Sequence, residues 1–109
     1  MASDIKLKTR PFDAADYLTE PEDQVELLED ALSLNDPIYI AVALGTVARA
    51  RGMTDIAKAA GVTREALYRA LSPKGDPRLS TLLGVVKALG FRLALVPITP
   101  ESDATIDPD

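Results

Sequence analysis

The pattern of apolar and polar residues predicts a helical chain. Over residues 19–33, Leu28 and Leu32 fall on one stripe of a helix, and acidic residues cover most of the remaining surface. Thr19 and Glu22 are three positions apart just ahead of this stripe, a spacing typical of a capping box. The pattern therefore predicts an amphipathic, acidic helix with Thr19 as its N-cap.

A second predicted helix is apolar on nearly all sides. It covers residues 38–50, follows Asp36 as N-cap and Pro37 in its first turn, and ends at Gly52. A helix that is apolar all round is normally buried. We therefore expect this segment to be the central core helix.

Three further helices are predicted after Gly52. Two are short, at residues 54–60 and 63–72, each opened by a threonine and separated by Gly61. The last starts at residue 79 or 80 and ends at Gly90. Its inner side is predicted to carry Leu82, Leu83, Val86 and Leu89.

Residues 91–97 change to an alternating pattern that predicts a β-strand. A lone strand needs a partner: part of residues 1–18, its own copy in a homodimer, or a strand of another protein. The predicted fold class is all-α, with five helices and a short C-terminal strand. The predicted organisation is an N-terminal arm (1–18), one domain (19–97) and a disordered acidic tail (98–109).

Charge changes this picture because it is segregated along the chain. Residues 1–48 hold three basic and ten acidic side chains, residues 49–92 hold nine basic and three acidic, and residues 93–109 hold four acidic and none basic. Such a field can attract phosphate to one face and a basic protein to another. The alternative is that solvated surface charges cluster by chance.

The composition offers little chemistry for catalysis. The chain has no cysteine and no histidine, so the usual thiol nucleophile, general base and thiolate metal ligands are missing. We predict no enzyme, no catalytic residue, no metal and no cofactor. The longest apolar stretch, residues 38–44, falls far short of the roughly 20 residues that cross a bilayer, and the N-terminus has no apolar signal region. We expect a cytoplasmic protein without a membrane partner.

The two short helices carry the most specific signal. A helix-turn-helix needs a small residue where its helices cross and a turn residue that tolerates positive φ, and Ala57 and Gly61 meet these demands. The alternative is an ordinary pair of amphipathic helices. The outer face of the second helix offers side chains that read base edges, and cations flank it. The predicted DNA contacts are Thr54, Lys58, Thr63, Arg64, Glu65, Tyr68, Arg69, Lys74 and Arg78.

The segment 43–95, its motif REALYRALS at 64–72 and the earlier FDAADYL at 12–18 resemble addiction-module antidote proteins. These are a HigA-like branch of the lambda-repressor-type (XRE) helix-turn-helix proteins. The resemblance implies a five-helix lambda-repressor-like domain, a homodimer on its own operator DNA, and neutralisation of a RelE/ParE-like or HigB-like toxin. One departure is Asp55, where such domains often place a glutamine, because a carboxylate cannot donate to phosphate.

A toxin that binds RNA is expected to be basic, so an acidic surface would steer its association. Aromatic residues near the N-terminus have the character of interface anchors. Alternatively, the charges only solvate a helix and the aromatics cover the domain's own core. The predicted toxin contacts are Phe12, Asp16, Tyr17, Glu22 and Glu26.

Two other functions fit parts of the sequence. A free-standing helix-turn-helix repressor would use the same DNA surface without a toxin partner. A protein-interaction module that has lost DNA binding would explain Asp55 and the net charge of −5.

Overall fold

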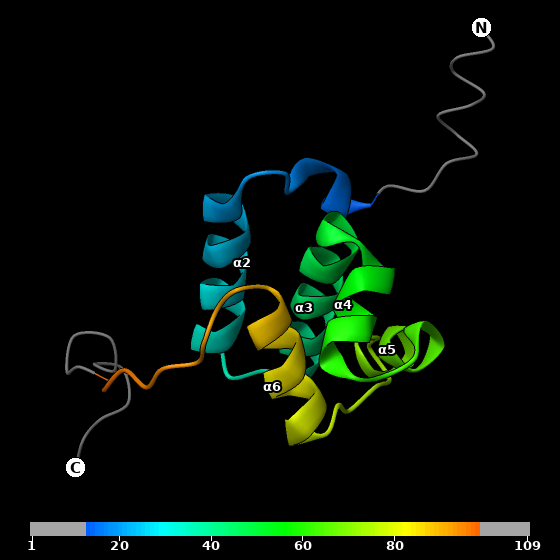
Figure 1. Ribbon diagram of the computed structural model, residues 1–109. Coiled ribbons are helices and arrows are strands. Elements are labelled where there is room, and N and C mark those ends of the chain that lie inside the picture. The colour runs from blue at the N-terminus through cyan, green and yellow to red at the C-terminus, as the bar shows by residue number, and fades with distance from the viewer. Residues whose placement is uncertain (1–12, 99–109) are drawn as a thin grey trace, which may run out of the picture.

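A computed structural model describes residues 13–98, and this part of the chain is all-α. One turn of 3-10 helix is followed along the chain by five α-helices, which are labelled in Figure 1. They are η1 (Ala14–Tyr17), α2 (Pro21–Ser33), α3 (Pro37–Arg51), α4 (Met53–Ala60), α5 (Arg64–Ala70) and α6 (Leu79–Ala88). The five predicted helices are confirmed, with shifts at their ends.

Helix α3 lies at the centre of the fold, as its apolar sequence predicts. It packs against η1, α2 and α4, while α4 in turn packs against α5 and α6. Val47 and Ala48 of α3 are fully buried, and so are Leu67 of α5 and Val85 of α6. One continuous apolar core therefore holds all five helices.

The start and end of α3 follow the predicted local chemistry. The Oδ1 of Asp36 accepts hydrogen bonds from the backbone N–H of Ile38 (3.0 Å) and Tyr39 (3.4 Å), and Pro37 is the first helical residue. Gly52 ends the helix at φ 117°. Because Gly52 also serves as the N-cap of α4, that helix begins at Met53 and not with Thr54 as a capping residue.

The predicted capping box at Thr19 is wrong. Helix α2 starts at Pro21, its N-cap is Glu20 in an extended conformation, and no side chain caps it. A residue before proline is kept out of the helical region by the proline ring, so Glu20 cannot be helical. Thr19 then lies one position too early to reach an N–H of the first turn.

The predicted strand at residues 91–97 is not seen. Within residues 13–98 the segment 91–98 is assigned neither helix nor strand, and it has no strand partner there. Ladder hydrogen bonds need a second extended segment, which the described part of one chain does not supply. The predicted tail, apart from Ile98, lies outside the described residues.

One residue of α6 that was predicted to face the core, Leu83, faces outward. Leu83 is 46% exposed, whereas Val85 is fully buried. Gly84 packs directly on α4, since a Cβ built on it would lie 3.4 Å from atoms of Ala60. This close approach fixes the rotation of α6 and turns Leu83 outward.

A polar network built on the buried Gln24 and the exposed Arg51 joins the two ends of the described chain. Gln24 is 2% exposed, donates to the carbonyl of Leu18 (2.8 Å) and accepts from Nε of Arg51 (2.8 Å). Arg51 also donates to the carbonyl of Leu89 (3.0 Å), and its guanidinium lies 5.8 Å from the ring centre of Phe91. The network therefore connects α2 and α3 to the end of α6.

Candidate nucleic-acid interface

The turn between α4 and α5 has the geometry that the sequence predicts. Gly61 adopts the left-handed conformation (φ 78°, ψ 26°), and its N–H donates to the carbonyl of Lys58 (3.2 Å). The N–H of Val62 donates to the carbonyl of Ala57 (3.0 Å), and Ala57 is only 2% exposed. Residues 61–63 therefore reverse the chain tightly over a small buried residue. We call α4 and α5 the short-helix pair.

Helix α5 is fixed from both ends. At its start, the Oγ1 of Thr63 accepts from the N–H of Ala66 (3.0 Å), which confirms the predicted N-cap. Inside, Leu67 is fully buried, and at the end Leu71 is 4% exposed. A Cβ on Gly45 of α3 would lie 2.8 Å from the carbonyl oxygen of Leu71, so α3 packs directly against this end. The outward side chains of α5 thus project from a rigid base.

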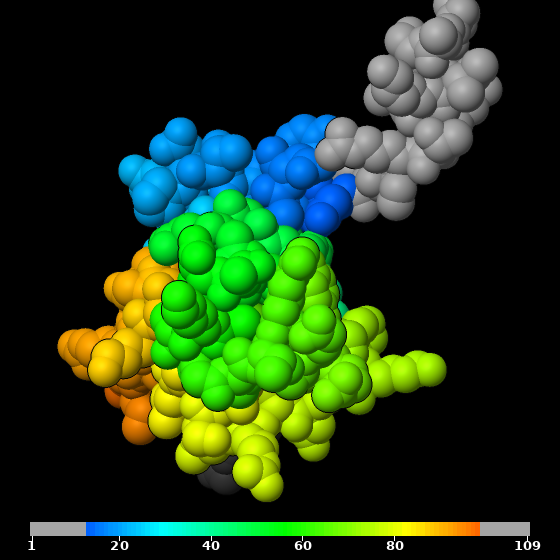
Figure 2. Space-filling view, turned by 45° about the vertical axis from the view of Figure 1, so that its right-hand side comes forward, coloured from blue at the N-terminus to red at the C-terminus, as the bar shows by residue number. Residues whose placement is uncertain are grey.

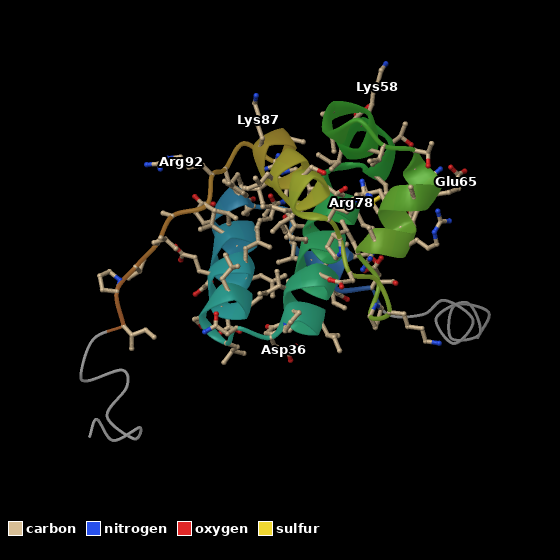
Figure 3. All side chains as sticks on the ribbon, turned by 90° about the horizontal axis from the view of Figure 1, so that it is seen from below. Asp36, Lys58, Glu65, Arg78, Lys87 and Arg92 are labelled. Carbon is tan, nitrogen blue, oxygen red and sulfur yellow. The ribbon has the colours of Figure 1, made fainter. Side chains whose placement is uncertain are left out.

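All nine predicted DNA contacts are exposed. Figure 2 shows the short-helix pair side by side at the front of the molecule, below η1. Figure 3 shows Lys58 pointing outward from α4 and Glu65 pointing outward from α5, with Arg78 at the start of α6. The residues of the predicted interface therefore lie on α4, on α5 and its N-cap, and on the segment between α5 and α6.

Two of these side chains contact each other. The guanidinium of Arg64 lies 5.4 Å from the ring centre of Tyr68, and its Nη2 is 3.5 Å from the tyrosine oxygen. An exposed cation–π contact is worth about 0.5–1 kcal/mol. Tyr68 can therefore orient the Arg64 guanidinium, and breaking this contact so that Arg64 can bind another group costs little free energy.

The loop after α5 is held against that helix. The Oγ of Ser72 donates to the carbonyl of Arg69 (2.8 Å), and the N–H of Gly75 donates to the carbonyl of Ser72 (2.9 Å). A Cβ on Gly75 would collide with the backbone carbonyls of Arg69 and Ala70. Only glycine permits this approach, so Lys74 is held beside the end of α5.

Arg49, in the last turn of α3, belongs to this surface, although it is not among the DNA contacts predicted from the sequence. Its Nε and Nη2 bind the carboxylate of Asp13 at 3.0 and 2.9 Å, and this ion pair raises the pKa of Arg49. Arg49 also lines a hollow of about 180 Å³ together with Tyr68 and Ser72. No local pattern could have paired two residues 36 positions apart.

The predicted toxin contacts lie on other elements. Asp16 and Tyr17 are exposed on η1, Glu22 and Glu26 are exposed on α2, and Phe12 lies outside the described residues. Figures 1 and 3 place α2 and α5 on opposite sides of α3. The acidic helix and the short-helix pair therefore offer two separate surfaces.

No metal site is found among the described side chains, in that residues 13–98 hold no group of three or more potential ligands. None of the helices in that range is long and apolar enough to cross a bilayer.

The fold and the surface define an all-helical domain with an exposed pair of short helices. The chain belongs to the family described as "Probable addiction module antidote protein", whose model matches residues 8–97. An uncharacterized protein of Haemophilus influenzae is 42% identical over 83 residues, which cover 76% of this chain and 86% of that protein. No solved structure matches the chain.

Proposed function

We propose that this protein is the antitoxin of a type II toxin–antitoxin module and represses its own operon. In this proposal the short-helix pair is a helix-turn-helix of the lambda-repressor (XRE) type, as in HigA-like antitoxins. The protein acts as a homodimer on double-stranded operator DNA and binds a basic RelE/ParE-like or HigB-like toxin. The exposed, rigidly supported α5, in a chain of the antidote family, carries the proposal.

The chemistry of α5 supports DNA binding. Its seven residues rise about 10 Å, which fits the width of a major groove. Arg64 can donate two hydrogen bonds to guanine, and Glu65 can accept from cytosine. Arg69, Lys74 and Arg78 are cations beside them, suited to phosphate.

The charge of α2 supports a basic protein partner. Its thirteen residues include five acidic side chains and no basic one, and all five acids are exposed. Such a surface attracts a cationic protein and repels DNA, so the two partners would approach different sides.

A paired experiment tests both halves. Co-expression with the product of the adjacent small gene should rescue growth, and the purified protein should bind a promoter duplex with steep salt dependence. Arg64→Ala should weaken and relax the preference for the promoter and keep the rescue. Glu22→Lys with Glu26→Lys should weaken the rescue and keep DNA binding. Failure of wild-type rescue contradicts the antitoxin function, and binding without salt dependence contradicts the DNA function.

If the protein binds its promoter and no toxin partner exists, it is a free-standing repressor. A gene without a small basic neighbour would point the same way. The exposed Asp55 in the first turn of α4 is the feature that favours an interaction module without DNA binding. If the wild-type protein binds the toxin and does not bind the duplex, it is an interaction module of this kind.

A further inference from the structure

An apolar hollow of about 210 Å³ lies between α2, α3 and α6. Ten apolar residues and two charged ones line it, with Leu28 and Leu32 from α2, Ile40 from α3, and Val86 from α6 among them. Residues 91–93 also line it. We call this hollow the α2–α6 groove. Its volume is several times the roughly 30 Å³ of one water molecule, and its walls offer water few partners.

The segment that leaves this groove is itself apolar and uncovered. Residues 93–98, which we call the C-terminal arm, contain no charged residue. Leu95 is 100% exposed, Val96 81% and Ile98 69%. Among the described residues, the last backbone hydrogen bond before the arm joins the N–H of Phe91 to the carbonyl of Val86 (3.0 Å). The arm is therefore not fixed to its own domain by backbone hydrogen bonds within residues 13–98.

Apart from Leu93, which lines it, the arm does not lie in the groove of its own chain. Figures 1 and 3 show it, in orange, leaving the helical body on the side away from α5. In Figure 3, Arg92 at its root and Glu65 on α5 point to opposite sides. Exposed apolar segments of this kind mark sites of association.

We propose that the C-terminal arm of each chain packs into the α2–α6 groove of a second copy. This inference rests on the homodimer of the proposed function and names its surface. Each chain brings one arm and one groove, so a two-fold exchange satisfies both and closes the assembly. Six extended residues reach about 20 Å, about the rise of the thirteen residues of α2. The arm can therefore run along the groove.

Charge favours a second copy over the basic toxin as the occupant. The uncharged arm can approach the acidic α2 without repulsion. A basic partner gains most from the exposed acids of α2, whereas the groove walls carry one acidic residue, Glu29, and one basic residue, Arg92. The exchange also leaves the short-helix pair of both copies uncovered for DNA.

Cysteine cross-linking tests the contact directly because the chain has no cysteine of its own. Leu95→Cys and Leu32→Cys are made separately, and the two proteins are mixed and oxidised. The exchange predicts a dominant disulfide between residues 95 and 32, which in such a mixture must join different chains. A dominant 95–95 disulfide would mean that the arms pair with each other. No cross-link would mean that they do not meet the groove. Either result overturns the proposal.

A second experiment measures the molecular mass of the protein in solution, which reports whether it is a monomer or a dimer. Leu95→Lys should raise the dissociation constant of the dimer about tenfold or more, because a charge would enter an apolar groove. Its matched control is Leu79→Lys on α6, which is 67% exposed and does not line the groove. Leu79→Lys should leave the dimer unchanged, and the reverse pattern would place the interface on the outer face of α6.

Failure of the arm exchange can be distinguished from failure of the proposed function. If wild-type protein is monomeric, or Leu95→Lys stays dimeric, the arm exchange is wrong even where promoter binding and toxin rescue both hold. If only toxin protects Leu32→Cys, in the wall of the groove, from a thiol reagent, the toxin and not a second copy occupies the groove.

Discussion

The short-helix pair and the α2–α6 side of the molecule differ in what they expose. From Met53 to Arg78, five basic residues reach the surface and Tyr68 is the one large apolar side chain that does so. The α2–α6 side exposes the five acids of α2 and most of the uncovered aliphatic residues, including Leu32, Leu83 and Leu95. The first surface suits a phosphate backbone, and the second suits proteins.

Both sides depend on one core, and Leu67→Ala should damage both. Leu67 is fully buried beneath α5, so its truncation should lower the free energy of unfolding by about 2–5 kcal/mol. The half-exposed Leu83 is the control, since Leu83→Ala should cost about 0.5 kcal/mol or less. Urea denaturation followed by circular dichroism measures both. Equal losses would mean that α6 is rotated differently from this structure.

The next largest effect is expected for Arg64→Ala, which should impair DNA binding by the short-helix pair and leave the α2–α6 side unaffected. We expect a loss of about 1–3 kcal/mol in binding to the promoter duplex, with relaxed preference at one base pair. Lys74→Ala should weaken all duplexes alike and reduce the slope of log affinity against log salt by about 1. Fluorescence anisotropy at two salt concentrations measures these changes. If both variants had the same effect on every duplex, the assignment of Arg64 to base reading would be wrong.

Charge reversal on α2 should impair toxin binding by the α2–α6 side and leave DNA binding by the short-helix pair unchanged. Glu22→Lys with Glu26→Lys should slow association with the toxin about tenfold at low salt, because exposed charges act mainly on the rate of encounter. Stopped-flow measurements at low and high salt check this. An equal change at both salt concentrations would mean that these residues do not steer the encounter. Ser80→Lys, at an exposed position of α6, is a control for a surface charge change.

The smallest effect is expected at the contact between η1 and α3. Asp13→Asn keeps an oxygen for the N–H of Ala15 and removes the ion pair with Arg49. A double-mutant cycle with Arg49→Gln should give a coupling of about 0.2–1 kcal/mol, the range of exposed pairs. Thermal unfolding of the four proteins measures it. A coupling of zero would mean that the pair does not hold η1 on α3.

Local chemistry explains which features the sequence could predict. Asp36, Gly61 and Thr63 act within three residues of themselves, so their caps and turn were correctly predicted. The box at Thr19 failed for an equally local reason, since Pro21 moves the N-cap to Glu20.

The remaining features depend on contacts that are distant in sequence. Leu83 could be placed only by knowing that Gly84 packs on Ala60. The network from Gln24 through Arg51 to Leu89 and the pair of Arg49 with Asp13 join residues 27 or more positions apart. The sequence of residues 91–97 shows an alternation typical of a β-strand. The sequence of one chain does not define which segment such a strand would pair with.

Backbone hydrogen exchange with each partner tests most directly whether two separate surfaces serve two partners. Saturating promoter duplex should slow exchange of amides in residues 54–78 and leave residues 21–33 unchanged. Saturating toxin should slow exchange in residues 16–30 and leave α5 unchanged. Protection of the same segment by both partners would contradict the account.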